Sequence, residues 1–285
     1  MKVGVHGIAL ALPIGKGTTI EETFETMKKA DIKCLTIPIQ SPVWNINPIN
    51  ITKNEITIIK EKIPSNIEIT GLGYSWPNEY TIITDSTKEF KRNLDYANKL
   101  SETASILGAN HVVVGSGGRS VPQGYPYYKG VKKLISFWKE ACIVAEEYGV
   151  VYCIEQSPYS STNVGNTIKS VCDIVEAVDS PSFQMIAQIK DMAVNDLDVS
   201  DSIMAGGDRI KQVHIGDISG YSPLTETGGS LLLPGKGVLS FIDIFRALKE
   251  IGYNGELSVE AFLSDDPVSD LVWCREFIEL TWRQA

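Results

Sequence analysis

Histidine, positive charge and long apolar runs are all scarce in this sequence. Its 285 residues include three histidines, and 26 lysines and arginines stand against 35 aspartates and glutamates, for a formal net charge of −9. The acidic balance argues against a nucleic-acid partner, because binding a phosphate backbone requires clustered positive charge. No run approaches the roughly 18 apolar residues of a membrane-spanning helix, so we expect no membrane partner.

Cysteines are few, odd in number and widely spaced. They stand at Cys34, Cys142, Cys153, Cys172 and Cys274, each within an apolar segment, and no CxxC occurs. This pattern argues against a disulfide framework or a zinc ribbon and favours reduced core thiols. The N-terminal residues lack the apolar stretch and cleavage site of a signal peptide, so we expect a cytoplasmic protein.

Short apolar, β-branched runs recur along the whole chain. There are eight of them: Val3–Ile8, Cys34–Ile39, Ile67–Gly73, His111–Val114, Val151–Glu155, Phe183–Gln188, Lys211–Ile215 and Leu257–Phe262. A run of this length and composition is typical of a buried strand.

Helical patterns lie between most of these runs. Thr19 with Glu22 forms a capping-box pattern at a helix start. Gly108 ends a long helical pattern, and Gly252 ends another that follows Ser240. The last helix is expected at about 268–283.

Strands that alternate with helices predict eight parallel strands joined by right-handed crossovers, which is a closed (β/α)8 barrel, or TIM barrel. We expect one such domain over residues 1–285. A doubly wound open sheet is the alternative, but no GxGxxG follows the first strand. The longest irregular segments are Ile39–Asn50, Gly115–Gly130, Gln156–Asn166 and Asp217–Gly237. All four follow strands, on the rim where a barrel places its active site.

Polar residues stand at the ends of four consecutive apolar strands: Glu155, Gln188, His214 and Glu260. Any one of them alone is more often a loop cap or a hydrogen-bonded core residue than a ligand. Together they would converge at the barrel mouth. Two carboxylates, one imidazole and one amide oxygen suit a divalent ion such as Mn²⁺, Mg²⁺ or Zn²⁺.

Other candidates could contact a substrate. His6 ends the first strand, and Trp76 with Tyr74 follows the third, where an aromatic wall could face a sugar ring. Arg119 lies in a glycine-rich segment and could bind a carboxylate or phosphate, and Lys236 could reach the substrate from the rim. Each also has an ordinary explanation, as a core histidine, a loop plug, a surface ion pair or a solvated lysine.

Several segments together resemble the xylose isomerase-like barrel superfamily of sugar isomerases and epimerases. They are Ile154-Glu155 with Thr162-Asn163, His214-Ile215 with Pro234-Gly235-Lys236-Gly237, and Phe241–Gly255 closing on Val259-Glu260. The segment Gly115–Arg119 is also similar to the corresponding loop of many members. The resemblance covers most of the chain and is best from about residue 108 to 262.

The resemblance implies a divalent metal held by Glu155, the sixth-strand position, His214 and Glu260. It also implies that the two glutamates move protons on the carbon next to a ketone. The chain departs from the family's sixth-strand motif Asp-x-x-His, because Gln188 and Asp191 stand at its two defined positions. Gln188 is then a weaker ligand, and Asp191 replaces a substrate-binding histidine.

The expected function is a divalent-metal-dependent isomerase or epimerase, with Mn²⁺, Mg²⁺, Co²⁺ or Zn²⁺, acting on a keto-sugar or polyol derivative by α-proton abstraction. A dehydratase or lyase on a keto-polyol is an alternative, because it begins with the same step. A barrel that binds a sugar or a partner without turnover is another. A DNA-repair endonuclease of related fold is disfavoured by the small number of histidines. Leu271, Trp273 and Trp282 could form a homo-oligomer contact or pack in the core.

Overall fold

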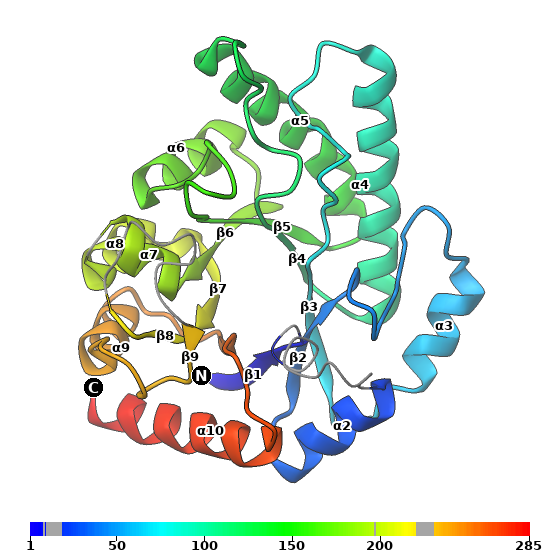
Figure 1. Cartoon of the computed structure of the whole chain (residues 1–285). Helices are drawn as coiled ribbons and strands as arrows, with labels where there is room; N and C mark the ends of the chain where they lie inside the picture. Colours follow the sequence, from blue (N-terminus) through cyan, green and yellow to red (C-terminus); the bar gives the residue numbers. More distant parts are fainter. Residues whose placement is uncertain (8, 10–18, 197, 221–230) are drawn as a thin grey trace.

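The computed structural model describes residues 1–7, 9, 19–196, 198–220 and 231–285, and its centre is a closed ring of strands (Figure 1). The strands of the ring are β1 (Lys2–His6), β2 (Cys34–Pro38), β3 (Glu68–Gly73), β4 (His111–Val114), β5 (Val151–Glu155), β6 (Phe183–Gln188), β7 (Ile210–Ile215) and β10 (Glu256–Val259). Their order is β1-β10-β7-β6-β5-β4-β3-β2, and every neighbouring pair is parallel. The predicted (β/α)8 TIM barrel is confirmed.

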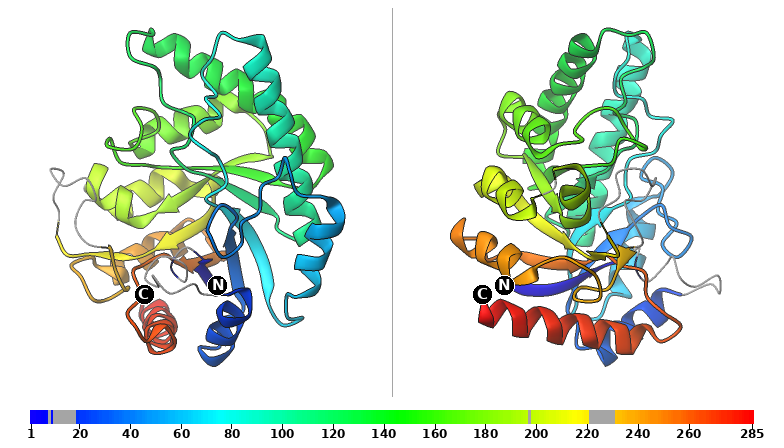
Figure 2. Two further views of the ribbon diagram at one scale, coloured as in Figure 1. Left: turned by 45° about the vertical axis from the view of Figure 1, so that its right-hand side comes forward. Right: turned by 60° about the vertical axis from the view of Figure 1, so that its left-hand side comes forward.

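Helices surround this ring on its outside, as Figures 1 and 2 show. They are α2 (Ile20–Lys29), α3 (Lys53–Glu61), α4 (Thr87–Leu107), α5 (Tyr127–Glu147), α6 (Ile168–Val178), α7 (Ile189–Asn195), α8 (Val199–Gly206), α9 (Phe241–Glu250) and α10 (Pro267–Gln284), with a short 3₁₀ turn, η1 (Gly207–Arg209). No helix of the described residues is long and apolar enough to cross a membrane.

Local sequence signals fix several helix ends. The Thr19 hydroxyl accepts from the Glu22 amide while the Glu22 carboxylate accepts from the Thr19 amide, so the predicted capping box of α2 is present. Gly108 ends α4 in the left-handed conformation, with φ of 90°. The predicted last helix corresponds to α10.

The main core lies between the strands and the helices, and all five cysteines of the chain are buried and free. Leu271 is fully buried and Trp282 packs against Phe245, so these two residues belong to the core rather than to an exposed contact surface. Trp273 stays partly exposed.

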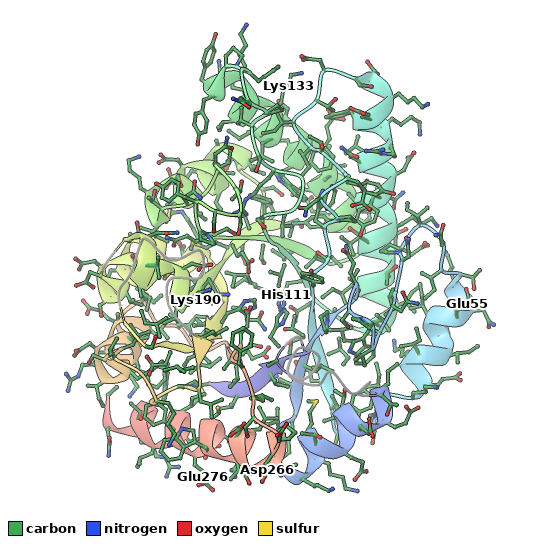
Figure 3. All side chains as sticks on the ribbon, in the orientation of Figure 1. Glu55, His111, Lys133, Lys190, Asp266 and Glu276 are labelled. Carbon is green, nitrogen blue, oxygen red and sulfur yellow. The ribbon has the colours of Figure 1, made fainter. Side chains whose placement is uncertain are left out.

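The inside of the barrel is polar as well as apolar. His111 points into it from β4, near the centre of the ring in Figure 3, and is almost fully buried. Gly71 and Gly73 face the same space from β3. A side chain at Gly71 would collide with His111, and one at Gly73 would collide with His6. Glycine at these two positions therefore makes room for two imidazole rings.

Three sequence-based boundaries need correction. The last barrel strand ends at Val259, so Glu260 lies just beyond it rather than inside a strand that reaches Phe262. The segment Gly115–Gly130 includes the start of α5, which begins at Tyr127. The segment Asp217–Gly237 is not wholly irregular, because β8 (Asp217–Ile218) pairs antiparallel with β9 (Leu231–Leu232). Residues 221–230 of that segment, and Ile8 of the first expected strand, lie outside the described residues.

Candidate active site

The four polar residues expected at the barrel mouth come together there. Gln188 on β6 is paired in register with His214 on β7, and the Glu260 amide donates to the Ile215 carbonyl at 2.9 Å. The Nδ1 atom of His214 lies 2.9 Å from Glu260 Oε2 and 3.7 Å from Glu155 Oε2. Gln188 Nε2 donates to Glu260 Oε2 at 2.9 Å. The carboxyl ends of neighbouring parallel strands thus place these side chains around one point.

His214 and Glu260 form a buried ion pair. Burial alone would raise the pKa of Glu260, but hydrogen bonds from His214 and Gln188 and the charge on the imidazole hold it well below its usual range. Burial opposes protonation of His214, yet its hydrogen bond to Glu260 and the charges of Glu260 and Glu155 raise its pKa overall.

Glu155 has the opposite tendency. Burial, and then the charge of Glu260, raise its pKa. The environments of the two carboxyls therefore shift their pKa values in opposite directions, that of Glu155 upward and that of Glu260 downward. Two such groups facing one space can give and take a proton, which is the arrangement expected of an acid–base pair.

Gln212 fixes the orientation of the His214 ring. The Gln212 amide nitrogen donates to Thr36 Oγ1 at 3.0 Å and to Glu256 Oε2 at 2.9 Å, so its oxygen is the acceptor for the two histidines. His214 Nε2 and His111 Nε2 lie 3.1 and 2.9 Å from that oxygen. His214 Nε2 therefore carries a hydrogen, and Nδ1 is the nitrogen that faces the carboxylates.

The donor set fits a divalent cation in chemical type, with two carboxylates, an imidazole and an amide. Neighbouring donors around an ion with bonds of about 2.1 Å sit roughly 3 Å apart, close to the spacing of His214 Nδ1 and Glu260 Oε2. Among the described residues, no three His, Cys, Asp or Glu side chains are already arranged as a metal centre. Instead His214 and Glu260 bond each other directly, and the sixth-strand position supplies the amide of Gln188.

A cavity of about 780 Å³ opens above these residues, in the size range of small-molecule sites. Glu155, Glu260 and His6 line its inner part, and the His6 ring meets His214 edge-on with 5.0 Å between ring centroids. Burial lowers the pKa of His6 to about 4. Trp76 forms part of the wall, with its indole nitrogen donating to the Tyr80 carbonyl at 2.9 Å.

The other expected substrate-binding residues lie outside the cavity lining. Arg119 is fully buried, with Nη1 donating to the Val114 carbonyl at 3.3 Å and with Nε and Nη2 lacking a hydrogen bond. Asp191 is buried at the start of α7, 4.0 Å from the Lys190 amine that Figure 3 labels, and burial raises its pKa to about 7. Neither residue meets the cavity surface directly.

Lys236 packs on an aromatic ring instead. Its Nζ lies 3.4 Å from the centroid of the Trp273 ring. The turn that carries Lys236 is held by Asp217, whose carboxylate accepts from the amides of Gly235, Gly237 and Leu239. Asp217, the first residue of β8, thus holds the Pro-Gly-Lys-Gly turn in place.

The sequence reasoning missed most of the outer cavity wall and the polar layer beneath the site. The outer wall is lined by residues that include Gln40, Asn45, Asn47, Asn78, Glu79, Tyr80 and Phe262. Gln40, Asn45 and Asn47 lie in the irregular segment Ile39–Asn50 that is expected on the active-site rim, and Phe262 ends the last expected strand, but no motif marks these individual residues as cavity lining. Gln212 did carry a signal, because it stands two positions before His214 and hence on the same face of its strand.

Two carboxylates and an imidazole lie at the C-terminal mouth of this parallel (β/α)8 barrel, which is where TIM-barrel enzymes carry their active sites. Residues 24–277 match the family described as xylose isomerase-like TIM barrel. The chain belongs to that family.

Relatives of known name are sugar epimerases. The chain is 27% identical over 125 residues to a D-psicose 3-epimerase of Enterocloster bolteae, covering 44% of this chain and 38% of that one. It is 27% identical over 150 residues to the L-ribulose-5-phosphate 3-epimerase UlaE of Shigella boydii, covering 52% and 49%. The chain thus spans about half or less of the length of these curated relatives.

Solved structures confirm the fold over the whole chain. A D-psicose 3-epimerase from Clostridium cellulolyticum H10, solved with D-tagatose, superposes with a TM-score of 0.81 at 17% identity and covers 99% of each chain. The IOLI protein with a bound zinc atom superposes with a TM-score of 0.78 at 17% identity, covering 100% of this chain and 99% of that one.

Proposed function

We propose that this protein is a divalent-metal-dependent isomerase or epimerase of a keto-sugar or polyol derivative. One observation carries the proposal: Glu155 and Glu260 both approach the same nitrogen of His214 and both line one cavity. The names of the curated relatives, a D-psicose 3-epimerase and an L-ribulose-5-phosphate 3-epimerase, agree with this chemistry.

Glu155, His214 and Glu260 would hold the cation, with the Gln188 amide as a weak fourth donor. A bound cation supplies Lewis-acid polarisation of a carbonyl, which makes the neighbouring C–H more acidic. The zinc atom bound in the IOLI structure supports a divalent metal here, and the carboxylate and imidazole donors would suit Mn²⁺, Mg²⁺, Co²⁺ or Zn²⁺.

Glu155 and Glu260 are the proposed acid–base pair. One carboxylate takes the proton from the carbon next to the ketone, and the other returns a proton from the opposite face, which inverts that carbon. Return of the proton to the adjacent carbonyl carbon would instead give isomerisation. His6 and Trp76 bound the space in which the sugar turns its reacting carbon toward the carboxylates.

A sugar-binding barrel without turnover is the second candidate. The observation that favours it is the hydrogen bond from Gln188 to Glu260, which occupies a carboxylate oxygen that would otherwise be free for a metal or a proton. A dehydratase shares the first step and differs only in the loss of a leaving hydroxyl.

Deuterium exchange separates these candidates. We expect the metal-stripped protein to incorporate no solvent deuterium into D-psicose or L-ribulose in D₂O, and the protein with Mn²⁺, Co²⁺ or Mg²⁺ to exchange the C3 proton. The Glu260→Gln variant is the control and should be inactive. Loss of water from the ketose would indicate the dehydratase, and sugar binding in calorimetry without exchange would indicate the binding barrel.

A further inference from the structure

The described lining of the cavity above the two glutamates contains acidic side chains and no basic one apart from His6. Its charged lining residues are Glu79, Glu155 and Glu260, and no lysine or arginine lines it in the part of the chain that the structure describes. Its remaining polar lining is uncharged at neutral pH. An anionic group entering this space would lose its hydration without gaining a lysine or arginine partner among the described lining residues.

Three cations that lie near lining residues in the sequence make other contacts. Arg119 lies buried beside Val114 outside the lining, and Lys236 lies on Trp273. Arg92 lies over the outer ring of Tyr80, 4.7 Å from its centroid, and donates to the Glu79 carbonyl at 3.0 Å. None of these three groups is placed to pair with a phosphate in the cavity.

The outer wall instead carries amides and aromatic rings. Gln40, Asn45 and Asn47 come from the segment after β2, and amides can both donate to and accept from sugar hydroxyls. Tyr74 and Phe262 border the opening with 62% and 55% of their surfaces exposed. Aromatic faces of this kind pack against the C–H face of a sugar ring.

Tyr74 also holds a costly backbone conformation. Its φ is 49°, in the left-handed region that a bulky residue rarely adopts. Strained, exposed residues of this kind tend to cluster at functional sites. An exposed aromatic ring in such a conformation at the mouth of a cavity is therefore a reason to expect a ligand there.

We propose that the site binds an uncharged sugar more tightly than its phosphorylated counterpart. The non-reacting end of the sugar lies between the side-chain amides of the segment after β2 (Gln40, Asn45 and Asn47) and the exposed rings of Tyr74 and Phe262. The placement of the reacting end at Glu155 and Glu260 rests on the function proposed above. The choice of an uncharged sugar rests on the charge and chemistry of the cavity wall.

Calorimetry on the full chain with Mn²⁺ tests this, using L-ribulose against L-ribulose 5-phosphate and D-psicose against D-psicose 6-phosphate. We expect each neutral sugar to bind at least tenfold more tightly than its phosphate. Equal or tighter binding of the phosphates, or no binding of any of the four, overturns the proposal. Binding of a neutral sugar without C3 deuterium exchange refutes the proposed reaction but leaves this inference standing.

Two variants locate the interaction. Glu79→Lys places a cation at the outer wall and should tighten binding of the phosphates at least threefold, whereas Glu140→Lys on α5, an exposed site outside the lining, should not. Phe262→Ala should weaken binding of the neutral sugars at least threefold, and the similarly exposed Tyr128→Ala should leave it unchanged. Equal effects of the cavity variants and their controls would contradict the assigned subsite.

Discussion

The neutral side chain of Gln188 offers the sharpest test of the proposed metal site. The Gln188→Glu variant keeps the length of the side chain but replaces an amide donor with a carboxylate. In the wild type the amide donates to Glu260 Oε2 at 2.9 Å, and the side chain is almost fully buried. The variant loses a hydrogen bond to a charged group, worth about 1.5–3 kcal/mol, and places a third carboxylate beside Glu155 and Glu260.

The metal-free variant should therefore be less stable. We expect the free energy of unfolding to fall by about 2–4 kcal/mol, which corresponds to a drop in Tm of roughly 3–7 °C for a chain of this size. Thermal unfolding in the presence of a chelator measures it. Gln188→Met is the control, because it removes the hydrogen bond without adding charge and so should lose less stability.

Metal affinity should change in the opposite direction. Two unit charges 4 Å apart attract with about 4 kcal/mol at an effective dielectric constant of about 20, and a dication doubles this. Desolvation offsets most of the gain, and about 1–3 kcal/mol should remain, or roughly 5- to 150-fold tighter binding of Mn²⁺ in calorimetry. Unchanged Mn²⁺ affinity in Gln188→Glu would refute the assignment of these side chains to one metal site.

Three further outcomes follow from the site and its surroundings. Glu155→Gln and Glu260→Gln should each lower epimerase turnover by about 10²- to 10⁴-fold, which is the usual contribution of a general acid or base. Steady-state kinetics measures the loss, and sugar binding comparable to that of the wild type is the control. His111→Gln removes a buried imidazole whose pKa is lowered to about 3, mainly by burial. Below about pH 6.5 the unfolded chain takes up a proton at this histidine, whereas the folded protein does not. The free energy of unfolding of the wild type should therefore fall, relative to that of the variant, by about 1.4 kcal/mol per pH unit between pH 6 and 4. Urea unfolding measures this difference, and parallel pH profiles of the two proteins would contradict it. Lys236→Met should leave kcat/KM within twofold, since Lys236 lies on Trp273, and a larger loss would instead support the substrate contact expected from sequence.

The barrel could be predicted because each of its strands is a short apolar, β-branched run that is visible in the sequence. All eight apolar runs correspond to barrel strands, and the ends of those runs are enough to place Glu155, Gln188 and His214 on one rim. Closure of the barrel then fixes their proximity, since neighbouring parallel strands run in register. Glu260 reaches the same point although its strand ends one residue earlier.

The direction in which side chains point could not be predicted in the same way. The sequence shows an amide at position 188, but only the structure shows that its nitrogen faces Glu260. Arg119 and Lys236 resemble ligands for an anion because they are cations in glycine-rich segments. Their burial and ring contact depend on how those segments fold back, which no period in the sequence encodes.

The replacement at position 188 and the lack of cations in the described cavity lining have one electrostatic explanation. Two carboxylates, Glu155 and Glu260, balance the charge of one dication, so a loaded site with a neutral Gln188 carries no net charge. A third carboxylate would leave an excess negative charge, which a nearby cation would have to offset. A balanced site needs no such cation, and an uncharged sugar disturbs that balance least. The Gln188→Glu variant, loaded with metal, should therefore discriminate even more strongly against sugar phosphates than the wild type does.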